Sequence, residues 1–491
     1  MSTRFLMAAG AAITAALASL TMAAQPAQAR SPAGGDQLWA SVGDPGAGSV
    51  TAVSPNGRTV FVSGTKGTPG EGQDYFTVAY SASTGKPRWT ATFSGDHDAN
   101  FVSAIAVSPD GRRLYVTGRS NFGADFATVA YNAATGRQLW LARYIPAHGV
   151  AEGDAIAVAP DGNTVYISGT TNRGIASGES GCETVAYQAA TGKQVWTRRY
   201  HPASAHFDRC EFLAEITDIL LRSNGTQPQQ TMAVSPDSGT VYLSAVTYFK
   251  PTGGRQEYPN YTVIALNAHT GTVRWSRTYN GDAVGPDTPV AVAVSPDGRS
   301  VFVTGGSRRP ASGFDYATVA YSASTGARKW VARYNGPSNR QDIATSMTFG
   351  NGGRLVIVTG ASKAKDTGED YATVAYAAAT GHRAWVSRYT GPVAGGVDVP
   401  IDIVPGHGGK VLYVTGTSFV ARLRPNFATI SYDAATGRQR WLSLYASPSH
   451  QARALMVAVS PDGSKVFVTG RGGSDPAHLS EYVFATVAYQ G

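Results

Sequence analysis

The 491-residue sequence has only two cysteines, and charged residues make up only 15% of it. It shows almost no long stretch with the 3.6-residue hydrophobic period of an amphipathic helix, which excludes a helical bundle. It also lacks a run of lysine and arginine of the kind that follows nucleic-acid phosphates, so we expect no nucleic-acid partner. Hydrophobic residues make up 42% of the chain, enough to bury a core, which excludes a disordered protein.

Turn-forming residues are abundant. The 57 glycines and 26 prolines are spread along the whole chain, and aromatic residues account for 10% of it. This composition is typical of many short strands joined by tight turns. The sequence therefore predicts an all-β protein.

The first 29 residues read as an export signal. Arg4 gives a positive start, an uncharged Ala/Leu/Met-rich stretch follows from Phe5 to Ala24, and Ala27-Gln28-Ala29 matches a small-x-small cleavage site. We expect residues 1–29 to be a signal peptide and the mature protein to be secreted, extracellular or associated with the cell envelope. An uncleaved membrane anchor stays open, because the apolar stretch is longer than usual. No later segment could span a bilayer.

A repeat runs through the chain. Asp315 to Tyr321 and Asp370 to Tyr376 have the same sequence, DYATVAY, and weaker copies of Thr-Val-Ala-Tyr recur elsewhere. The threonine of this unit occurs eight times, at Thr77, Thr128, Thr184, Thr262, Thr318, Thr373, Thr429 and Thr486. Each unit spans about 50 residues, a period that indicates a solenoid, a propeller or an array.

Each unit is expected to form four antiparallel strands. In one unit the strands are expected at residues 292–295, 300–304, 316–321 and 328–334. Pro-Asp-Gly and Ser-Thr-Gly supply the hairpin turns between them. The first strand has small residues and the fourth has Trp and Tyr, so each sheet is a wedge, and wedges close into a ring.

The tryptophans give the number of blades. Seven units end in a fourth-strand tryptophan, at Trp89, Trp140, Trp196, Trp275, Trp330, Trp385 and Trp441. The eighth unit stops at Gly491 without a fourth strand, whereas Gly35 to Trp39 has the same Gly-x-x-x-Trp spacing near the N-terminus. The sequence predicts an eight-bladed β-propeller over residues 30–491, in which an N-terminal strand completes the last blade.

Cys182 and Cys210 are the only cysteines. In an exported chain an even number favours a disulfide, and two unrelated buried thiols are the alternative. Cys210 lies in an insertion at about residues 201–230, where apolar residues at helical spacing predict a short helix. This insertion is either a lid or partner contact, or a segment that packs only its own apolar face.

Candidate ligand-binding residues lie on the loops expected at the mouth of the central channel. They are His97, Asp98, His148, Asp154, Asp287, Asp342, Asp398 and Arg453. Such carboxylates could hold Ca²⁺, and a His/Asp group could do acid–base work, although polar turn residues are the ordinary background. No catalytic or metal-binding residue is assigned, and no cofactor is expected beyond the possibility of Ca²⁺.

Two further sets of polar residues are expected to be structural. The aspartates before the third strand, such as Asp125 and Asp370, are expected to bond nearby backbone N–H groups. The arginines of the fourth strand, such as Arg143 and Arg388, are expected to form a solvated rim.

The repeat resembles two known families. The segments from Asn132 to Trp140 and from Asp433 to Trp441 are similar to the tryptophan-docking repeats of PQQ-type eight-bladed propellers. Val-Thr-Gly followed by DYATVAY resembles the bacterial SBBP propeller repeat. The resemblance implies the fold, and it would also imply a quinone cofactor, but the adjacent cysteine pair of the quinone dehydrogenases is missing.

Three functions are compatible with these observations. The first is a secreted, monomeric, non-catalytic scaffold that binds an extracellular protein or glycan, and this is the function we expect. The second is a hydrolase or lyase with a site at the channel mouth. The third is a PQQ-dependent dehydrogenase, which the missing cysteine pair disfavours.

Overall fold

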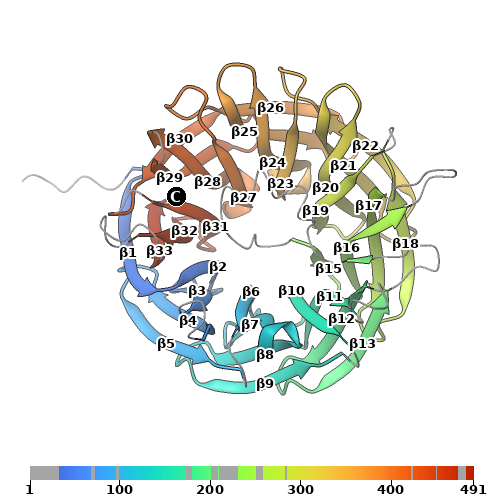
Figure 1. The fold of residues 1–491 in the computed structure, drawn as a ribbon, viewed down its shortest axis with the longest axis vertical. Coiled ribbons are helices and arrows are strands. Elements are labelled where there is room, and N and C mark those ends of the chain that lie inside the picture. Colours follow the sequence, from blue (N-terminus) through green and yellow to red (C-terminus); the bar gives the residue numbers. More distant parts are fainter. Residues whose placement is uncertain are drawn as a thin grey trace, which may run out of the picture. The chain divides into compact units, whose positions relative to one another are not determined.

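Eight antiparallel sheets stand around a central channel in the computed structural model (Figure 1). The structure describes residues 33–67, 72–95, 99–146, 149–172, 180–200, 208–209, 230–249, 258–281, 285–421, 424–448, 451–473 and 483–491. Residues 33–491 form one compact unit. In each sheet the first strand of the unit lies at the channel and the fourth lies outermost (Figure 1). The predicted eight-bladed propeller is confirmed.

The blades follow the chain in order. Blade 1 contains β2 (Ala47–Val53), β3 (Thr59–Lys66), β4 (Asp74–Ser81) and β5 (Pro87–Phe93). Blade 2 contains β6 (Phe101–Val107), β7 (Arg113–Ser120), β8 (Asp125–Asn132) and β9 (Gln138–Tyr144), with the 3₁₀ turn η1 (Asn121–Gly123) between β7 and β8. Blade 3 contains β10 (Val150–Val158), β11 (Thr164–Asn172), β12 (Ser180–Gln188) and β13 (Gln194–Tyr200). Blade 4 contains β14 (Asp208–Arg209), β15 (Met232–Val234), β16 (Thr240–Phe249), β17 (Tyr258–Asn267) and β18 (Val273–Tyr279).

The second half repeats the pattern. Blade 5 contains β19 (Asp287–Val294), β20 (Ser300–Arg309), β21 (Gly313–Ser322) and β22 (Arg328–Tyr334). Blade 6 contains β23 (Asp342–Gly350), η3 (Asn351–Gly353), β24 (Leu355–Ala364), β25 (Gly368–Ala377) and β26 (Arg383–Tyr389). Blade 7 contains β27 (Val399–Pro405), η4 (His407–Gly409), β28 (Val411–Ala421), β29 (Arg424–Asp433) and β30 (Gln439–Tyr445). Blade 8 contains β31 (Arg453–Val459), β32 (Lys465–Gly472), β33 (Val483–Gln490) and, from the other end of the sequence, β1 (Gln37–Pro45).

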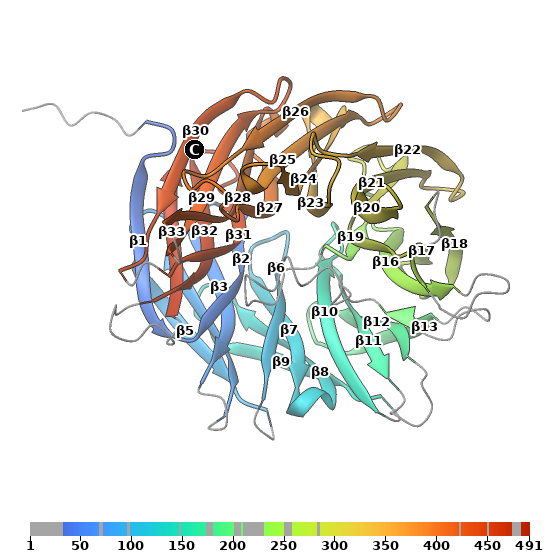
Figure 2. The ribbon, with the colours of Figure 1, turned by 45° about the horizontal axis from the view of Figure 1, so that its top comes forward.

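The ring closes through β1. This strand lies beside β33 (Figure 2) and runs antiparallel to it. Trp39 lies opposite Ala488. The N–H of Gly35 donates to the carbonyl of Gln490 at 2.9 Å, which joins the two ends of the described chain. Closure by an N-terminal strand is confirmed, and it leaves β33 without an open edge.

Tryptophans dock each blade onto the next one. The indole N–H of Trp89 donates to the carbonyl of Ala133 at 3.1 Å, and seven of the eight tryptophans make this bond at 2.9 to 3.2 Å. The ring lies on the glycine of the next blade's Thr-Gly turn: a Cβ atom on Gly136 would be only 2.6 Å from Cε3 of Trp89. The eighth, Trp441, lies in the same way on Gly35. The Thr-Gly-x-x-x-Trp motif is therefore a contact between neighbouring blades.

Replacing one of these glycines should be costly. Gly136 has φ +72°, so Gly136→Ala strains the backbone and also drives a methyl group into Trp89. We expect it to lower the free energy of unfolding by about 3 kcal/mol in urea titrations. Gly313→Ala is the control, since Gly313 has φ +84° with no atom within 4 Å of an added Cβ; it should cost about 1 kcal/mol. Equal losses in the two variants would contradict the docking contact.

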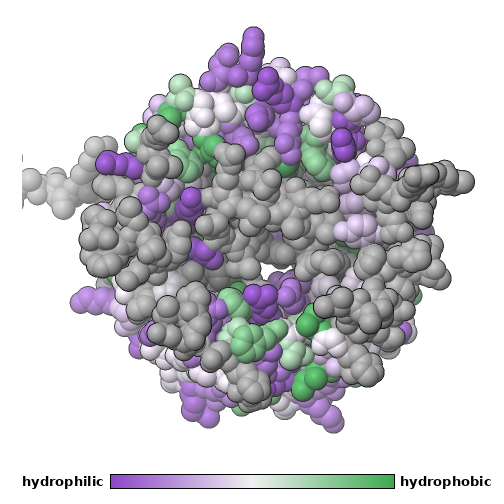
Figure 3. Space-filling view, in the orientation of Figure 1, coloured by the Kyte–Doolittle hydropathy of each residue, from purple (hydrophilic) through white to green (hydrophobic). Residues whose placement is uncertain are grey.

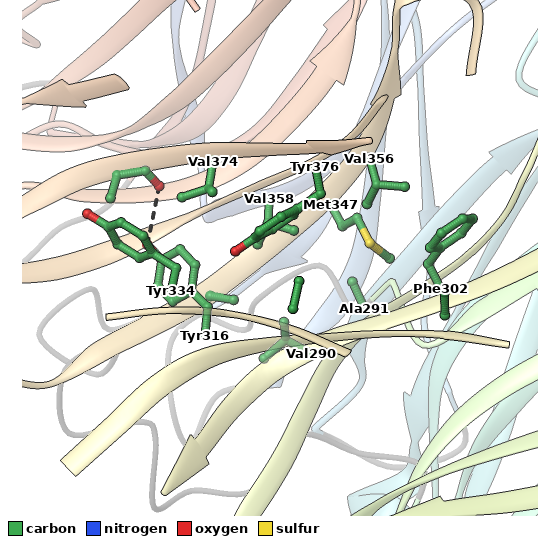
Figure 4. Packing of buried hydrophobic residues seen from close by; sticks show 14 residues of the cluster. Val290, Ala291, Phe302, Tyr316, Tyr334, Met347, Val356, Val358, Val374 and Tyr376 are labelled. Atoms are coloured by element: carbon green, nitrogen blue, oxygen red, sulfur yellow. Dashed lines mark hydrogen bonds between the residues drawn. The ribbon is translucent and has the colours of Figure 1, made fainter. Parts of the chain in front are cut away.

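The core lies between the blades. Between blades 5 and 6, aliphatic side chains and tyrosines from both sheets interlock (Figure 4). The buried Tyr316 also donates its hydroxyl proton to the carbonyl of Ala372 in the next blade, at 3.2 Å. Each sheet thus buries both faces against its neighbours, which a single blade could not do.

The insertion enters blade 4 at the channel wall. Both β14 and β15 pair with β16, so the insertion divides the innermost strand of this blade. The predicted helix lies outside the described residues. Cys182 is buried in β12 and is not a free thiol, but Cys210 is outside the described residues, so the bridge between them stays a prediction. In the described part of the chain, no helix has the length and hydrophobicity to cross a bilayer.

Candidate functional site

The innermost strands enclose a cavity of about 440 Å³ in the central channel. Its wall consists of small and aliphatic side chains with a few polar ones, such as Ser103 and Gln230, and three methionines, Met232, Met347 and Met456. Among the residues that the structure describes, Asp402 is the only ionisable one in this wall. A wall of this composition is suited to packing or to apolar contact more than to acid–base chemistry.

Bulges in seven innermost strands set which side chains reach the channel; these strands are β2, β6, β10, β19, β23, β27 and β31. In β19 the register shifts between Pro289 and Ala291, opposite Gly305. A Cβ atom on Gly305 would lie 2.0 Å from the carbonyl oxygen of Thr288, so only glycine permits this approach. The glycine of the repeated Val-Thr-Gly motif therefore shapes the channel wall.

Asp402 was not among the predicted site residues. It is the first paired residue after the bulge of β27, opposite Thr415, where most other blades have alanine, valine or serine, and it is buried. One carboxylate oxygen accepts from Ser346 Oγ at 3.1 Å in blade 6, and the other accepts from Val457 N at 3.0 Å in blade 8. Asp402 thus links three consecutive blades. Its sequence signal was the single acid in Ile-Asp-Ile, where the repeat has Val-Ala-Val.

Three predicted channel-mouth residues lie where innermost strands start: Asp287 and Asp342 are the first residues of β19 and β23, and Asp398 directly precedes β27. Asp287, Asp342 and Asp398 are at most 1% exposed. One carboxylate oxygen of each accepts from a glycine N–H in the loop before its strand, at 2.6 to 2.7 Å. Each of these aspartates therefore holds the connection that arrives from the preceding blade, at three different blades of the ring.

The other candidates are placed as follows. Asp154 lies at the bulge of β10, and Arg453 is the first residue of β31, opposite Arg471. His97, Asp98 and His148 lie outside the described residues. Among the residues that the structure describes, no three His, Cys, Asp or Glu side chains come close enough together to hold a metal ion.

Two arginines of the fourth strands, Arg143 and Arg388, do not form the solvated rim that the sequence predicted. Arg388 forms an ion pair with Asp370 at 3.0 Å, and Arg143 lies 3.7 Å from Asp125. The side chains of both arginines are less than a quarter exposed. The aspartates at the start of the third strand therefore bind arginine side chains, and Asp125 and Asp370 also accept from the side chains of Asn121 and Thr367 in the preceding turns. Their expected bonds to backbone N–H groups stay a prediction.

Burial changes the titration of Asp342. It raises the pKa of this carboxyl from 3.8 to about 6, and the charge of Asp315 adds to the rise. Because the folded state holds the proton more tightly, the stabilisation is complete below pH 4 and is lost as the pH rises to about 6. We expect the free energy of unfolding to fall by about 2 kcal/mol across this window, and Asp342→Asn to abolish this fall.

Asp462 provides the opposite case. The Ser460 hydroxyl and the N–H of Ser464 lower the pKa of this carboxyl to about 2. Its contribution is present above pH 4 and is lost as the pH falls toward 2. The prediction for Asp342 would be contradicted if the free energy of unfolding still fell between pH 4 and pH 6 in Asp342→Asn as it does in wild type.

An apolar patch lies on the loop face at blades 2 and 3. It consists of Phe122 in η1 and of Ile145 and Val150, which flank the connection from β9 to β10; their exposed fractions are 70%, 68% and 46%. The turn η1 contacts β10, so the three lie in one region. Figure 3 shows green, hydrophobic atoms on the lower part of the face, where Figure 1 draws β6 to β10. We call these three residues the loop-face patch.

In this propeller, tryptophans dock each blade onto the next one, and the last blade contains strands from both ends of the chain. These two features define a PQQ-like β-propeller. The chain belongs to the family described as outer membrane protein assembly factor BamB, whose profile matches residues 24–247, 183–364 and 259–474. None of the curated proteins matches the chain.

Solved structures share the fold. Sqt1 of Chaetomium thermophilum, crystallised with the N-terminus of the ribosomal protein L10, is 13% identical with a TM-score of 0.59, and the match covers 93% of this chain and all of Sqt1. The quinohemoprotein alcohol dehydrogenase of Comamonas testosteroni is 13% identical with a TM-score of 0.56, and the match covers 92% of this chain and 76% of the enzyme. At these identities the similarity shows the architecture alone.

Proposed function

We infer that this protein is a secreted, non-catalytic propeller that binds a partner protein through the loop-face patch. The observation that carries this proposal is the exposure of Phe122, whose side chain is 70% accessible beside two aliphatic side chains. Aromatic anchors surrounded by aliphatic side chains are typical centres of protein–protein interfaces.

The backbone holds Phe122 in a strained conformation. Asn121 has φ +53° and Phe122 has φ +59°, values that cost a bulky residue roughly 1–2 kcal/mol. Asn121 N donates to Asn100 Oδ1 at 3.2 Å and its side chain donates to Asp125 at 3.0 Å, which keeps the turn in place. Strain that presents an aromatic ring to solvent favours a binding role, because it gives the folded protein alone no evident benefit.

Further support comes from the rest of the molecule. The repeated residues close turns, dock blades or staple loops, and Asp402 in the channel wall already accepts bonds from two neighbouring blades. The aliphatic neighbours of Phe122 favour a protein partner over a glycan. Secretion rests on the export signal expected in residues 1–29.

The test is capture of a partner by purified protein in the culture medium and cell envelope of its source organism. Phe122→Ser should weaken capture of that partner at least about tenfold. Leu141→Ser is the matched control, because Leu141 is 38% exposed on the outermost strand of the same blade but outside the patch. A partner held equally by wild type and Phe122→Ser would overturn the proposal, and circular dichroism would check that both variants fold.

A further inference from the structure

All methionines outside residues 1–29 lie in the wall of the channel cavity. They are Met232, Met347 and Met456, on the innermost strands of blades 4, 6 and 8. All eight blades contribute residues to this wall, which surrounds the centre of the ring (Figure 1). Methionine side chains are flexible and polarizable, so they adapt to ligands of different shape and contact aromatic rings favourably.

The wall also leaves apolar surface uncovered. Ile105, Ile156 and Val404 line the cavity and are only partly buried. The cavity of about 440 Å³ has the size of an ordinary ligand pocket, roughly 300–1,000 Å³. A molecule that covers these side chains removes apolar surface from water, which favours its binding.

Backbone N–H groups of the innermost strands bond to the neighbouring blade at one register position. This position is the second paired residue after the bulge. In blades 1, 7 and 8 the acceptor is the side chain of the first paired residue after the bulge in the preceding blade. Thr51 N donates to Met456 Sδ at 3.1 Å, Ile403 N to Ser346 Oγ at 3.3 Å and Val457 N to Asp402 Oδ2 at 3.0 Å.

Gln230 supplies the acceptors for blades 5 and 6. Its carbonyl oxygen accepts from Val292 N at 2.7 Å, and its side-chain oxygen accepts from Met347 N at 3.2 Å. The register position that bonds to the neighbouring blade is thus the same in five blades.

Blades 2 and 3 have this N–H group without its acceptor. It belongs to Ile105 and Ile156, and the preceding blades have Val50 and Ala104 at the acceptor position. Neither side chain carries an acceptor atom. Among the residues that the structure describes, no neighbouring blade offers an acceptor to Ile105 N or Ile156 N. All four residues line the cavity.

Asp402 shows that one small group can bond to two such N–H groups. Its Oδ1 accepts from Ile403 N at 2.9 Å and its Oδ2 accepts from Val457 N at 3.0 Å, in the consecutive blades 7 and 8. Ile105 and Ile156 occupy the same two register positions in the consecutive blades 2 and 3. An oxygen-bearing group of a ligand can therefore take the place there that Asp402 has in blades 7 and 8.

We propose that the channel cavity binds an uncharged, largely apolar small molecule whose carbonyl group accepts from the N–H groups of Ile105 and Ile156. Among the described residues of the wall, Asp402 is the only ionisable one, so an anionic ligand would have no counter-charge. The oxygens of Asp402 already accept from neighbouring blades, which disfavours a cationic ligand. The site is separate from the loop-face patch, whose residues do not line the cavity.

A soft metal ion fits this wall less well. Thioether sulfurs are ligands of Cu(I), but Met456 Sδ already accepts from Thr51 N, and Met347 is only 3% exposed within the core between blades 5 and 6. Silver nitrate is therefore the competing probe in the test.

The test compares acetophenone with ethylbenzene, which has a similar shape but no carbonyl oxygen. The readout is the methyl NMR spectrum of the full-length protein labelled in its six methionines, three of which lie in residues 1–29. Acetophenone should shift the signals of the channel methionines, assigned by single Met→Leu variants, with a Kd of roughly 1 mM. Ethylbenzene should bind about fivefold more weakly, because it leaves both N–H groups unpaired.

Ala104→Asp should remove the site. It copies Asp402 into blade 2, where its carboxylate would take the N–H groups of Ile105 and Ile156, and it should bind acetophenone at least about tenfold more weakly. Ala104→Val is the matched control, since blade 1 has Val50 at this position, and it should bind within about twofold of wild type. Circular dichroism checks the folding of both variants.

Several outcomes would overturn the proposal. They are no shift with acetophenone, equal affinity for acetophenone and ethylbenzene, unchanged binding by Ala104→Asp, and shifts with silver nitrate alone. The comparison with ethylbenzene needs no variant, so it decides the matter even where Ala104→Asp does not fold. Phe122→Ser should bind acetophenone like wild type, so a failure of the proposed function and a failure of this site are seen separately.

Discussion

A chain that begins at residue 47, and so lacks β1, should unfold at a temperature roughly 10 °C or more below that of a chain beginning at residue 33. Removing β1 exposes the hydrogen-bonding edge of β33 and deletes Trp39, whose indole donates to Ala82 at 3.1 Å and lies on Gly85 of blade 1. One deletion therefore opens two contacts of the ring. Because an uncovered strand edge also pairs with other chains, the shortened protein should aggregate.

Complementation provides the control for this deletion. A synthetic peptide of residues 33–46 should restore part of the lost stability when it is added to the shortened chain, since it carries the whole of β1 (Gln37–Pro45). Differential scanning calorimetry measures both effects. Equal unfolding temperatures for the two chains would show that β1 does not hold the ring closed.

Asp402→Ala should lower the free energy of unfolding by about 3–5 kcal/mol in denaturant titrations. The substitution leaves the Ser346 hydroxyl and the Val457 N–H without their acceptor inside the protein, at the point where blades 6, 7 and 8 meet. Ser346→Ala is the control, because it removes a single donor and should cost about 1 kcal/mol. A loss of only about 1 kcal/mol in both variants would mean that Asp402 does not link the blades.

The same carboxylate should have a pH signature. Burial raises the pKa of Asp402 above its usual value, against the lowering effect of the bonds from Val457 and Ser346. The folded state therefore binds the proton more tightly, and the stabilisation from it is lost as the pH rises through the folded-state pKa. Asp402→Ala should remove this part of the pH dependence, and a parallel pH profile in wild type and variant would contradict it.

The repeat made the fold predictable. The spacing of Thr-Gly and Trp gave the number of blades, and the same spacing at Gly35 to Trp39 gave the closure, both of which the pairing of β1 with β33 confirms. The fourth expected strand, residues 328–334, matches β22, whereas the first three were shorter than the observed strands, for example residues 292–295 against β19 (Asp287–Val294). The missing part of β19 precedes its bulge, where the pairing register shifts and alternation of side chains breaks off.

The candidate site was less predictable. Counting His and Asp on loops selected Asp287, Asp342 and Asp398, which the structure buries as loop staples. This selection missed Asp402, because Asp402 lies within a strand. It also missed Phe122, because no sequence motif marks a phenylalanine on a loop as functional. The type of a loop residue does not show whether its side chain points into the protein or into solvent. Its burial and its backbone φ show this, and both require the structure.

From the sequence alone one could determine the blade, its turns, its wedge shape and the number of copies, because each of these depends on residues close together in one repeat. Only the tertiary structure decided where individual copies differ in their exposure and contacts. The link that Asp402 makes between three blades joins residues about 55 positions apart in the chain, and the exposure of Phe122 follows from the strained turn η1, neither of which the repeat pattern reports. A repeated sequence specifies the scaffold that all blades share. Residues that differ from the repeat can be interpreted only from their contacts and exposure in the folded ring.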